Sequence, residues 1–107
     1  MTPIGEMRHR LVLEAPNETP DGIGGVTRAW TTLATVWAAI EPVAAEDQVV
    51  ADRRLGVLTH RIVIRQRDGL TTHHRFRLGA RVFVIRAIRD LEERGRFLEC
   101  LTEEERP

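Results

Sequence analysis

The sequence predicts an all-β protein: a small β-barrel of about six or seven antiparallel strands, with one long insertion between two of them. Short stretches alternate apolar and polar side chains, as a strand does when one face lies on a core. Turns rich in Gly, Pro and Asp separate these stretches. The 107 residues have the length of one domain, so we expect residues 1–107 to form a single domain.

The strand pattern recurs along most of the chain. In residues 59–65 the alternation is clearest, with Ile62 and Ile64 on one face. Residues 33–40 fit a helix or a strand by composition, but the neighbouring Trp and Thr residues favour a strand. Gly79-Ala80 is typical of a tight turn between two strands. The predicted strands are residues 8–14, 33–40, 59–65, 75–78, 81–88 and 96–101.

Two segments interrupt this rhythm. Residues 15–25 are expected to form a polar loop, whose turn contains Asp21, Gly22, Gly24 and Gly25. Residues 44–55 favour a short helix, with acids in the first turn and arginines in the last, and Gly56 stands where a helix stops. This insertion, residues 44–56, is the least core-like part of the chain, and function tends to reside in such excursions. Its candidate functional residues are Glu46, Asp47, Gln48, Val49, Val50, Asp52, Arg53 and Arg54.

The bulk charge argues against a free-standing nucleic-acid-binding protein. Basic and acidic residues number 16 each, so the formal net charge is +0, whereas DNA-binding proteins usually carry a positive excess. A net charge near zero favours association with other subunits. The N-terminus lacks the apolar stretch of a signal peptide, and no apolar run has the length of a membrane span. A reducing cytoplasm is therefore expected.

Catalytic and metal-binding constellations are not recognisable in the sequence. His73 and His74 are adjacent, so in a strand they point to opposite faces and do not share a metal. His60 lies on the apolar face, where a core histidine is the ordinary interpretation. The single Cys100 fits a small core residue, and the chain contains no Ser to act as a nucleophile. We expect no enzymatic activity, no cofactor and no metal.

Two groups of side chains are candidates for packing and for contacts. Trp30 and Trp37 are expected to anchor the core, with an interface role as the alternative. The other expected core residues are Ile62, Ile64, Val82, Val84 and Leu98. A stripe of arginines lies at outward positions of neighbouring strands, which fits either a solvated face with acids opposite or a surface facing partner subunits or DNA. Its interface candidates are Arg61, Arg65, Arg75, Arg77 and Arg81.

The order of these features resembles the head-tail joining proteins of tailed bacteriophages, also called head-closure or stopper proteins, and their relatives in gene transfer agents. The similarity covers residues 7–103. It is carried by His-Arg-Leu-Val-Leu (9–13), Asp-Gly-x-Gly-Gly (21–25), Trp30, Val-Trp-Ala-x-Ile-x-Pro (36–42), Glu46, Thr-His-x-Ile-x-Ile-Arg (59–65), Val-Phe-x-Ile (82–85), Asp90 and Arg-x-Leu-x-Cys (96–100). The family motif often has Ser-Gly before the insertion's acid, where this chain has Ala44-Ala45.

The resemblance implies a virion protein: a subunit of a homo-oligomeric ring of six or twelve copies in the neck of the particle, assembled in the bacterial cytoplasm. Its implied partners are the portal or adaptor proteins on the head side, a tail-terminator or tail-completion protein on the tail side, and the double-stranded DNA that passes through the channel. Residues 44–56 would then face the channel and help to hold the DNA. The rivals are a small β-barrel that binds nucleic acid through its Arg face, and a ring at an adjacent position of the connector.

Overall fold

The computed structural model describes residues 7–43, 58–91 and 95–105. The described residues fold into six strands and no helix. The insertion predicted at 44–56, with the short helix expected over 44–55 and all eight of its candidate residues, lies outside the described part of the chain. The strands are β1 (His9–Pro20), β2 (Val26–Pro42), β3 (His60–Arg65), β4 (Arg75–Leu78), β5 (Arg81–Asp90) and β6 (Phe97–Glu105).

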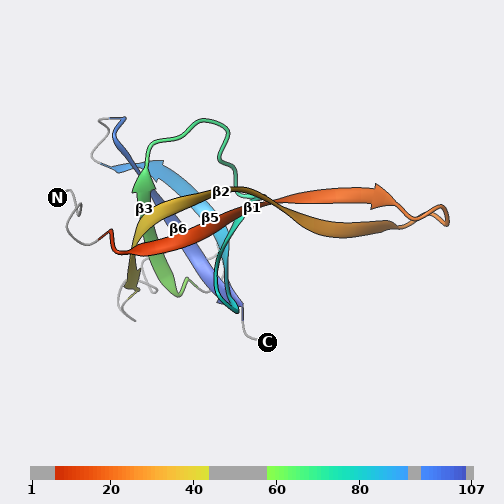
Figure 1. The fold of residues 1–107 in the computed structure, drawn as a ribbon, viewed down its shortest axis with the longest axis horizontal. Coiled ribbons are helices and arrows are strands. Elements are labelled where there is room, and N and C mark those ends of the chain that lie inside the picture. Colours follow the sequence, from red (N-terminus) through yellow and green to blue (C-terminus); the bar gives the residue numbers. More distant parts are fainter. Residues whose placement is uncertain (1–6, 44–57, 92–94, 106–107) are drawn as a thin grey trace.

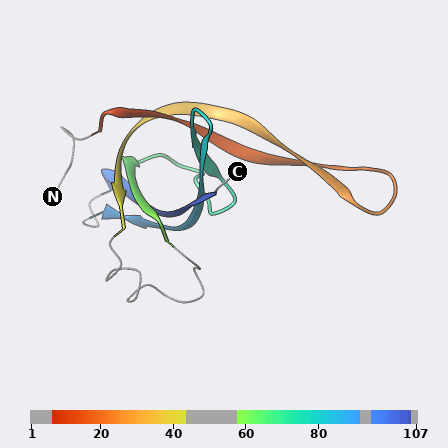
Figure 2. The same cartoon turned by 90° about the horizontal axis from the view of Figure 1, so that it is seen from below.

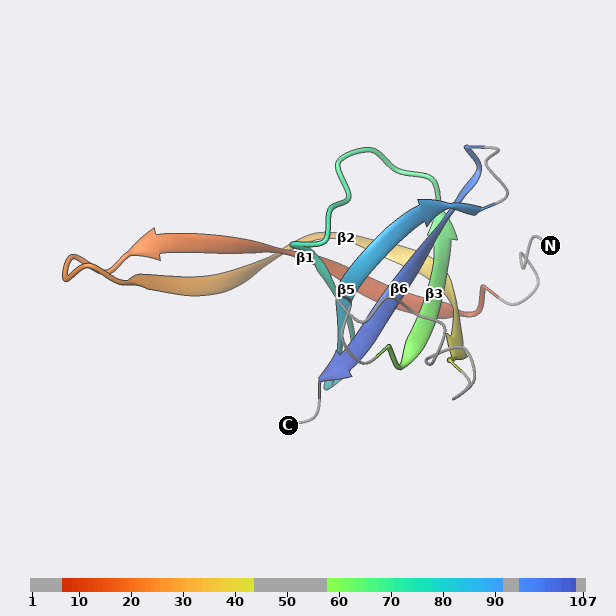
Figure 3. The same ribbon diagram turned by 180° about the vertical axis from the view of Figure 1, so that it is seen from behind.

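The strands close into an antiparallel barrel in the order β1-β2-β3-β6-β5-β4 (Figures 1 and 2). Closure depends on β4, a strand of four residues that pairs with β1 on one side and with β5 on the other. On the opposite wall, β3, β6 and β5 lie side by side, as Figure 3 shows from behind. The all-β barrel expected from the sequence is confirmed.

The interior of the barrel is filled by side chains from all six strands. Phe76 of β4 and Phe83 of β5 are opposite each other in the strand register and fully buried. Around them pack Leu11, Leu13, Ala38, Ile62, Ile64, Ile85, Leu98 and Cys100. A second, smaller cluster consists of Ala39, Val63 and Phe97, at alternate positions of β2, β3 and β6. Met7 and Leu91, just outside the strands, pack against it. Burial of these two clusters is the main source of the barrel's stability.

The β1–β2 hairpin extends well beyond the barrel and forms an arm (Figure 1). We use "the arm" for residues 15–32, which pair with each other from Ala15–Thr31 out to Pro20–Val26. The register shifts between Leu13 and Glu14, where β2 carries one extra residue, Leu33. Such a bulge bends a strand, and it stands where the hairpin leaves the barrel wall. The arm gives the molecule its long axis, with extents of 49 × 30 × 26 Å.

The expected polar loop over residues 15–25 is wrong for most of its length. Residues 15–20 continue β1, and the turn is confined to residues 21–25. Pro16 and Pro20 suggested a loop because proline usually interrupts a ladder. A strand tolerates proline where the missing N–H points away from its partner, which is the arrangement in this arm.

Some of the expected core positions are also wrong. Trp37 is 54% exposed on the outer face of β2, and Trp30 is half-buried on the arm. In β5 the core residues are Phe83 and Ile85, while Val82 and Val84 are half-buried on the alternate face. Both faces of β5 are apolar, so alternation alone did not identify the inner one. Ile62, Ile64 and Leu98 lie in the barrel core.

Candidate assembly surface

The tip of the arm is a tight turn that Asp21 organises. Its carboxylate Oδ1 accepts hydrogen bonds from the backbone N–H of Ile23 at 2.8 Å and of Gly25 at 3.0 Å. Gly22 and Gly24 have φ angles of 84° and 90°, in the left-handed region that favours glycine. The turn residues named from the sequence, Asp21, Gly22, Gly24 and Gly25, therefore lie together at the end of the arm. Ile23 is presented at the tip with 89% of its surface exposed.

The shaft of the arm is exposed and nearly free of unbalanced charge. Glu18 on β1 and Arg28 on β2 face each other and form an ion pair. The other exposed side chains of its β2 strand are Val26, Thr27, Ala29, Thr31 and Thr32. A two-stranded ribbon is at best marginally stable alone, so this arm depends on how its base is fixed to the barrel.

The base of the arm is fixed by one buried carboxylate. Glu14, whose side chain is 7% exposed, accepts hydrogen bonds from Arg75 Nε at 2.8 Å and Arg77 Nε at 3.1 Å on β4. Burial by itself raises the pKa of Glu14, but the two guanidinium groups outweigh that effect and hold the pKa below its usual value. The guanidinium of Arg75 also lies 3.9 Å from the centre of the Trp30 ring. This contact joins the arm to the barrel through a cation–π interaction.

Two of the other three arginines of the predicted stripe, Arg61 and Arg81, are matched by carboxylates across the strands. Arg61 contacts Glu41 and Glu99, and Arg81 makes a two-pronged contact with Glu104. Two further pairs join β5 to β6, Arg86 with Glu103 and Arg89 with Glu99. Arg65 lies over the ring of Phe97. Acids therefore lie opposite four of the five candidates, and the role of these arginines in contacts with partner subunits stays a prediction.

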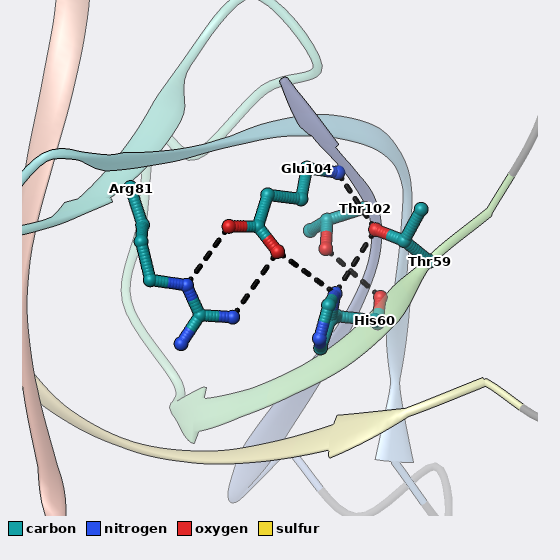
Figure 4. A network of polar contacts seen from close by, with 5 residues as sticks. All are labelled: Thr59, His60, Arg81, Thr102 and Glu104. Carbon is teal, nitrogen blue, oxygen red and sulfur yellow. Dashed lines mark hydrogen bonds and ion pairs between the residues drawn. The ribbon is translucent and has the colours of Figure 1, made fainter. Parts of the chain in front are cut away.

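A polar cluster at one end of the barrel brings together Thr59, His60, Arg81, Thr102 and Glu104 (Figure 4). Thr59 Oγ1 accepts a hydrogen bond from the Glu104 N–H at 2.7 Å and lies 3.0 Å from His60 Nδ1. The carboxylate of Glu104 lies 3.9 Å from that same nitrogen. In a nucleophile–base–acid relay the hydroxyl and the carboxylate contact different ring nitrogens, so this cluster does not have relay geometry.

The same cluster affects the protonation of His60. The ring is half-buried and packs edge-on against Phe83 with the centroids 5.3 Å apart. Burial lowers the pKa of His60; Glu104 raises it and Arg81 lowers it, with a net shift downwards. The cluster is best described as a set of polar contacts that closes one end of the barrel.

Cys100 and the possible metal ligands were the remaining candidates for a chemical role. Cys100 is fully buried in the core, and burial raises the pKa of its thiol to about 12, so it is not an activated nucleophile. Within residues 7–43, 58–91 and 95–105, no three His, Cys, Asp or Glu side chains are grouped to hold a metal ion. The described part also has no helix with the length and apolar character needed to cross a membrane.

Exposed apolar side chains concentrate on the β1–β2 hairpin. The large ones are Ile23, Val26, Leu33 and Trp37, from 49% to 89% exposed. Three of the four lie on β2, and Ile23 lies in the turn that precedes it. This surface was not predicted from the sequence, because residues 15–25 have the composition of a loop and Trp37 is a residue type that usually packs in a core. The β-branched and aromatic residues of 26–32, which are Val26, Thr27, Trp30, Thr31 and Thr32, were the signal that could have extended the hairpin.

By its fold the protein belongs to the class of small, closed antiparallel β-barrels, with a hairpin arm that extends from the wall. The model of the phage head completion protein family matches residues 2–105, and the chain belongs to that family.

Two solved structures resemble this one over nearly their whole length. One is a chain of the virion of a native gene transfer agent particle, with 28% identity, a TM-score of 0.66 and coverage of 92% of this chain and 94% of that one. The other is protein SF1141 from Shigella flexneri 2a, solved in solution, with 25% identity, a TM-score of 0.76 and coverage of 96% of each chain. No curated protein sequence matches the chain. The protein is therefore a structural component of a phage or phage-like particle, as the resemblance implied.

Proposed function

We propose that this protein is a subunit of the connector ring between the head and the tail, where it joins the portal or adaptor side to the tail and helps to hold DNA in the capsid. The observation that carries the proposal is the match to the head completion family over residues 2–105. The likeness to a chain of a gene transfer agent virion supports it. A ring of six or twelve copies follows from the resemblance to stopper proteins, and so do an adaptor or portal above and a tail-completion protein below.

The charges of the barrel wall favour contact with protein over contact with DNA. The wall arginines 61, 75, 77, 81, 86 and 89 each have a carboxylate partner, so they are not a field of unmatched cations waiting for phosphates. Alternating pairs of this kind suit the complementary patches of a head-to-tail ring. We therefore do not favour the rival function, a nucleic-acid-binding module.

The experiment compares particles made with and without this protein. Heads made without it should contain less nuclease-protected DNA and lack an annulus at the tail vertex in electron micrographs. Purified protein added back should restore the annulus and the attachment of tails. Heads that retain their DNA and accept tails equally well without the protein would refute the proposal.

The proposal for residues 44–56 rests on the resemblance alone, since these residues lie outside the described part of the chain. Deleting them should leave the annulus intact and let DNA escape from heads without tails. Intact heads that keep their DNA after this deletion would remove the channel role from the segment.

A further inference from the structure

The two edges of the arm differ in their ability to pair with another strand. Which backbone groups point outward follows from the tip, where the Asp21 N–H donates to the Gly25 C=O at 3.1 Å. In an antiparallel ladder, hydrogen-bonded pairs alternate with non-bonded pairs, whose N–H and C=O groups point away from the partner strand. Counting back from the tip, the non-bonded pairs of the arm are 20/26, 18/28 and 16/30.

The β1 edge of the arm is blocked. Of its three outward positions, two are Pro16 and Pro20, which have no N–H to donate. Glu18 supplies the one outward amide between them. An edge that lacks two of three successive donors is a poor template for an added strand.

The β2 edge of the same arm is open. Its outward positions, Val26, Arg28 and Trp30, all have an N–H and a C=O, and residues 26–32 contain no proline. The next strand along the barrel, β3, pairs with β2 only from Ala38 to Pro42. Among the described residues, nothing pairs with this edge between 26 and 32.

We propose that the β2 edge of the arm, residues 26–32, accepts an extended segment of another protein of the particle, which adds a third strand to the hairpin. Addition of a strand to an exposed edge is a general mode of recognition: main-chain hydrogen bonds supply affinity and alternate side chains supply specificity. The side chains of residues 26–32 are Val, Ala, Thr and Trp except for Arg28, which is paired with Glu18. The segment that fits is therefore uncharged and rich in β-branched residues.

The choice of an unlike partner over a second copy rests on the proposed function. Neighbours in a head-to-tail ring are not related by a two-fold axis, whereas antiparallel pairing of this edge with its own copy creates one. The arm's other edge is blocked by Pro16 and Pro20. The strands of the barrel are joined to one another in a closed order. Among the described residues no other open edge can supply the strand, so we assign the added strand to a different protein.

Amide hydrogen exchange tests the pairing directly, in the free protein and in completed heads. The amides of Val26, Arg28 and Trp30 should exchange at least tenfold more slowly in heads. The amide of Glu18 points outward from the blocked edge, so it is the internal control and should be unchanged. Equal exchange of the three β2 amides in both states overturns the proposal. Their protection in the purified protein, together with a dimeric mass, overturns it in favour of a second copy.

A matched pair of variants tests whether the edge is needed. Val26→Pro removes an outward donor and leaves the β1–β2 hydrogen bonds intact, while Val26→Ala trims the same side chain and keeps the donor. We expect Val26→Pro to lower the number of copies bound per head at least tenfold, and Val26→Ala to bind as wild type. Thermal unfolding shows whether the Val26→Pro variant folds. If this variant does not fold, the amide-exchange experiment on the wild-type protein decides whether the edge is paired in heads.

The outcomes separate this inference from the function on which it rests. Wild-type protein that never joins heads refutes both. Wild-type and Val26→Pro proteins that join heads equally well refute only the role of the edge.

Discussion

Glu14 joins the base of the arm to β4 through Arg75 and Arg77, and Glu14→Gln tests the importance of these contacts. Removing one partner of a fully buried ion pair costs about 3–5 kcal/mol. Here Arg75 and Arg77 are 18% and 39% exposed, so water can solvate part of their charge once the carboxylate is gone. We therefore expect a loss of about 2 kcal/mol in the free energy of unfolding.

The loss is measured by urea and thermal unfolding at pH 7. For a domain of this size, about 2 kcal/mol corresponds to a decrease in Tm of roughly 10 °C. The matched control is Glu18→Gln, which breaks the Arg28 pair on the arm, where both side chains are about half exposed, and should change stability by less than about 0.5 kcal/mol. Equal effects of the two substitutions would refute the reasoning that burial makes the Glu14 contacts strong.

The remaining predictions concern the core, the ionisable groups and the arm. Phe83→Ala should cost about 3–5 kcal/mol in urea unfolding because it leaves a cavity at the centre of the barrel. The pKa of the Cys100 thiol is raised to about 12 in the fold, so the unfolded chain loses this proton first as the pH rises. The free energy of unfolding should therefore fall by about 1.4 kcal/mol per pH unit above pH 9, and Cys100→Ala should not show this slope. The pKa of His60 is lowered in the fold, so the unfolded chain binds a proton on this imidazole first as the pH falls. The free energy of unfolding should therefore decrease as the pH drops below about 6.5, and it should decrease less in His60→Gln. Deleting residues 17–29 should leave a folded barrel by circular dichroism but abolish joining to heads, since these residues contribute nothing to the core; loss of folding would show that the arm supports the barrel.

The alternation of side chains was enough to predict most of the barrel. Ile62 and Ile64 showed the inward face of β3, because its other face carries Arg61 and Arg65. β5 lacked such a contrast, since Val82 and Val84 are as apolar as the residues that fill the core. Only the pairing of β5 with β4 and β6 selects its inner face, and that pairing involves residues far apart in the sequence.

The arm and the ion pairs could not be predicted from the sequence for a similar reason. Whether Pro16 interrupts a strand depends on which way its missing N–H would have pointed, and the register of the hairpin decides that. Likewise, Glu14 meets Arg75 across more than 60 positions of sequence, so no local pattern links them. The stripe of arginines was visible in the sequence, but its partners were not.

The two prolines of the arm also limit how far an assembly can grow. A two-stranded ribbon with two open edges could pair with further molecules on both sides without limit, as the strands of amyloid fibrils do. If a strand adds to the β2 edge as we propose, the β1 edge of the same arm offers too few donors for a second one. We therefore expect pairing through the arm to stop after one added strand.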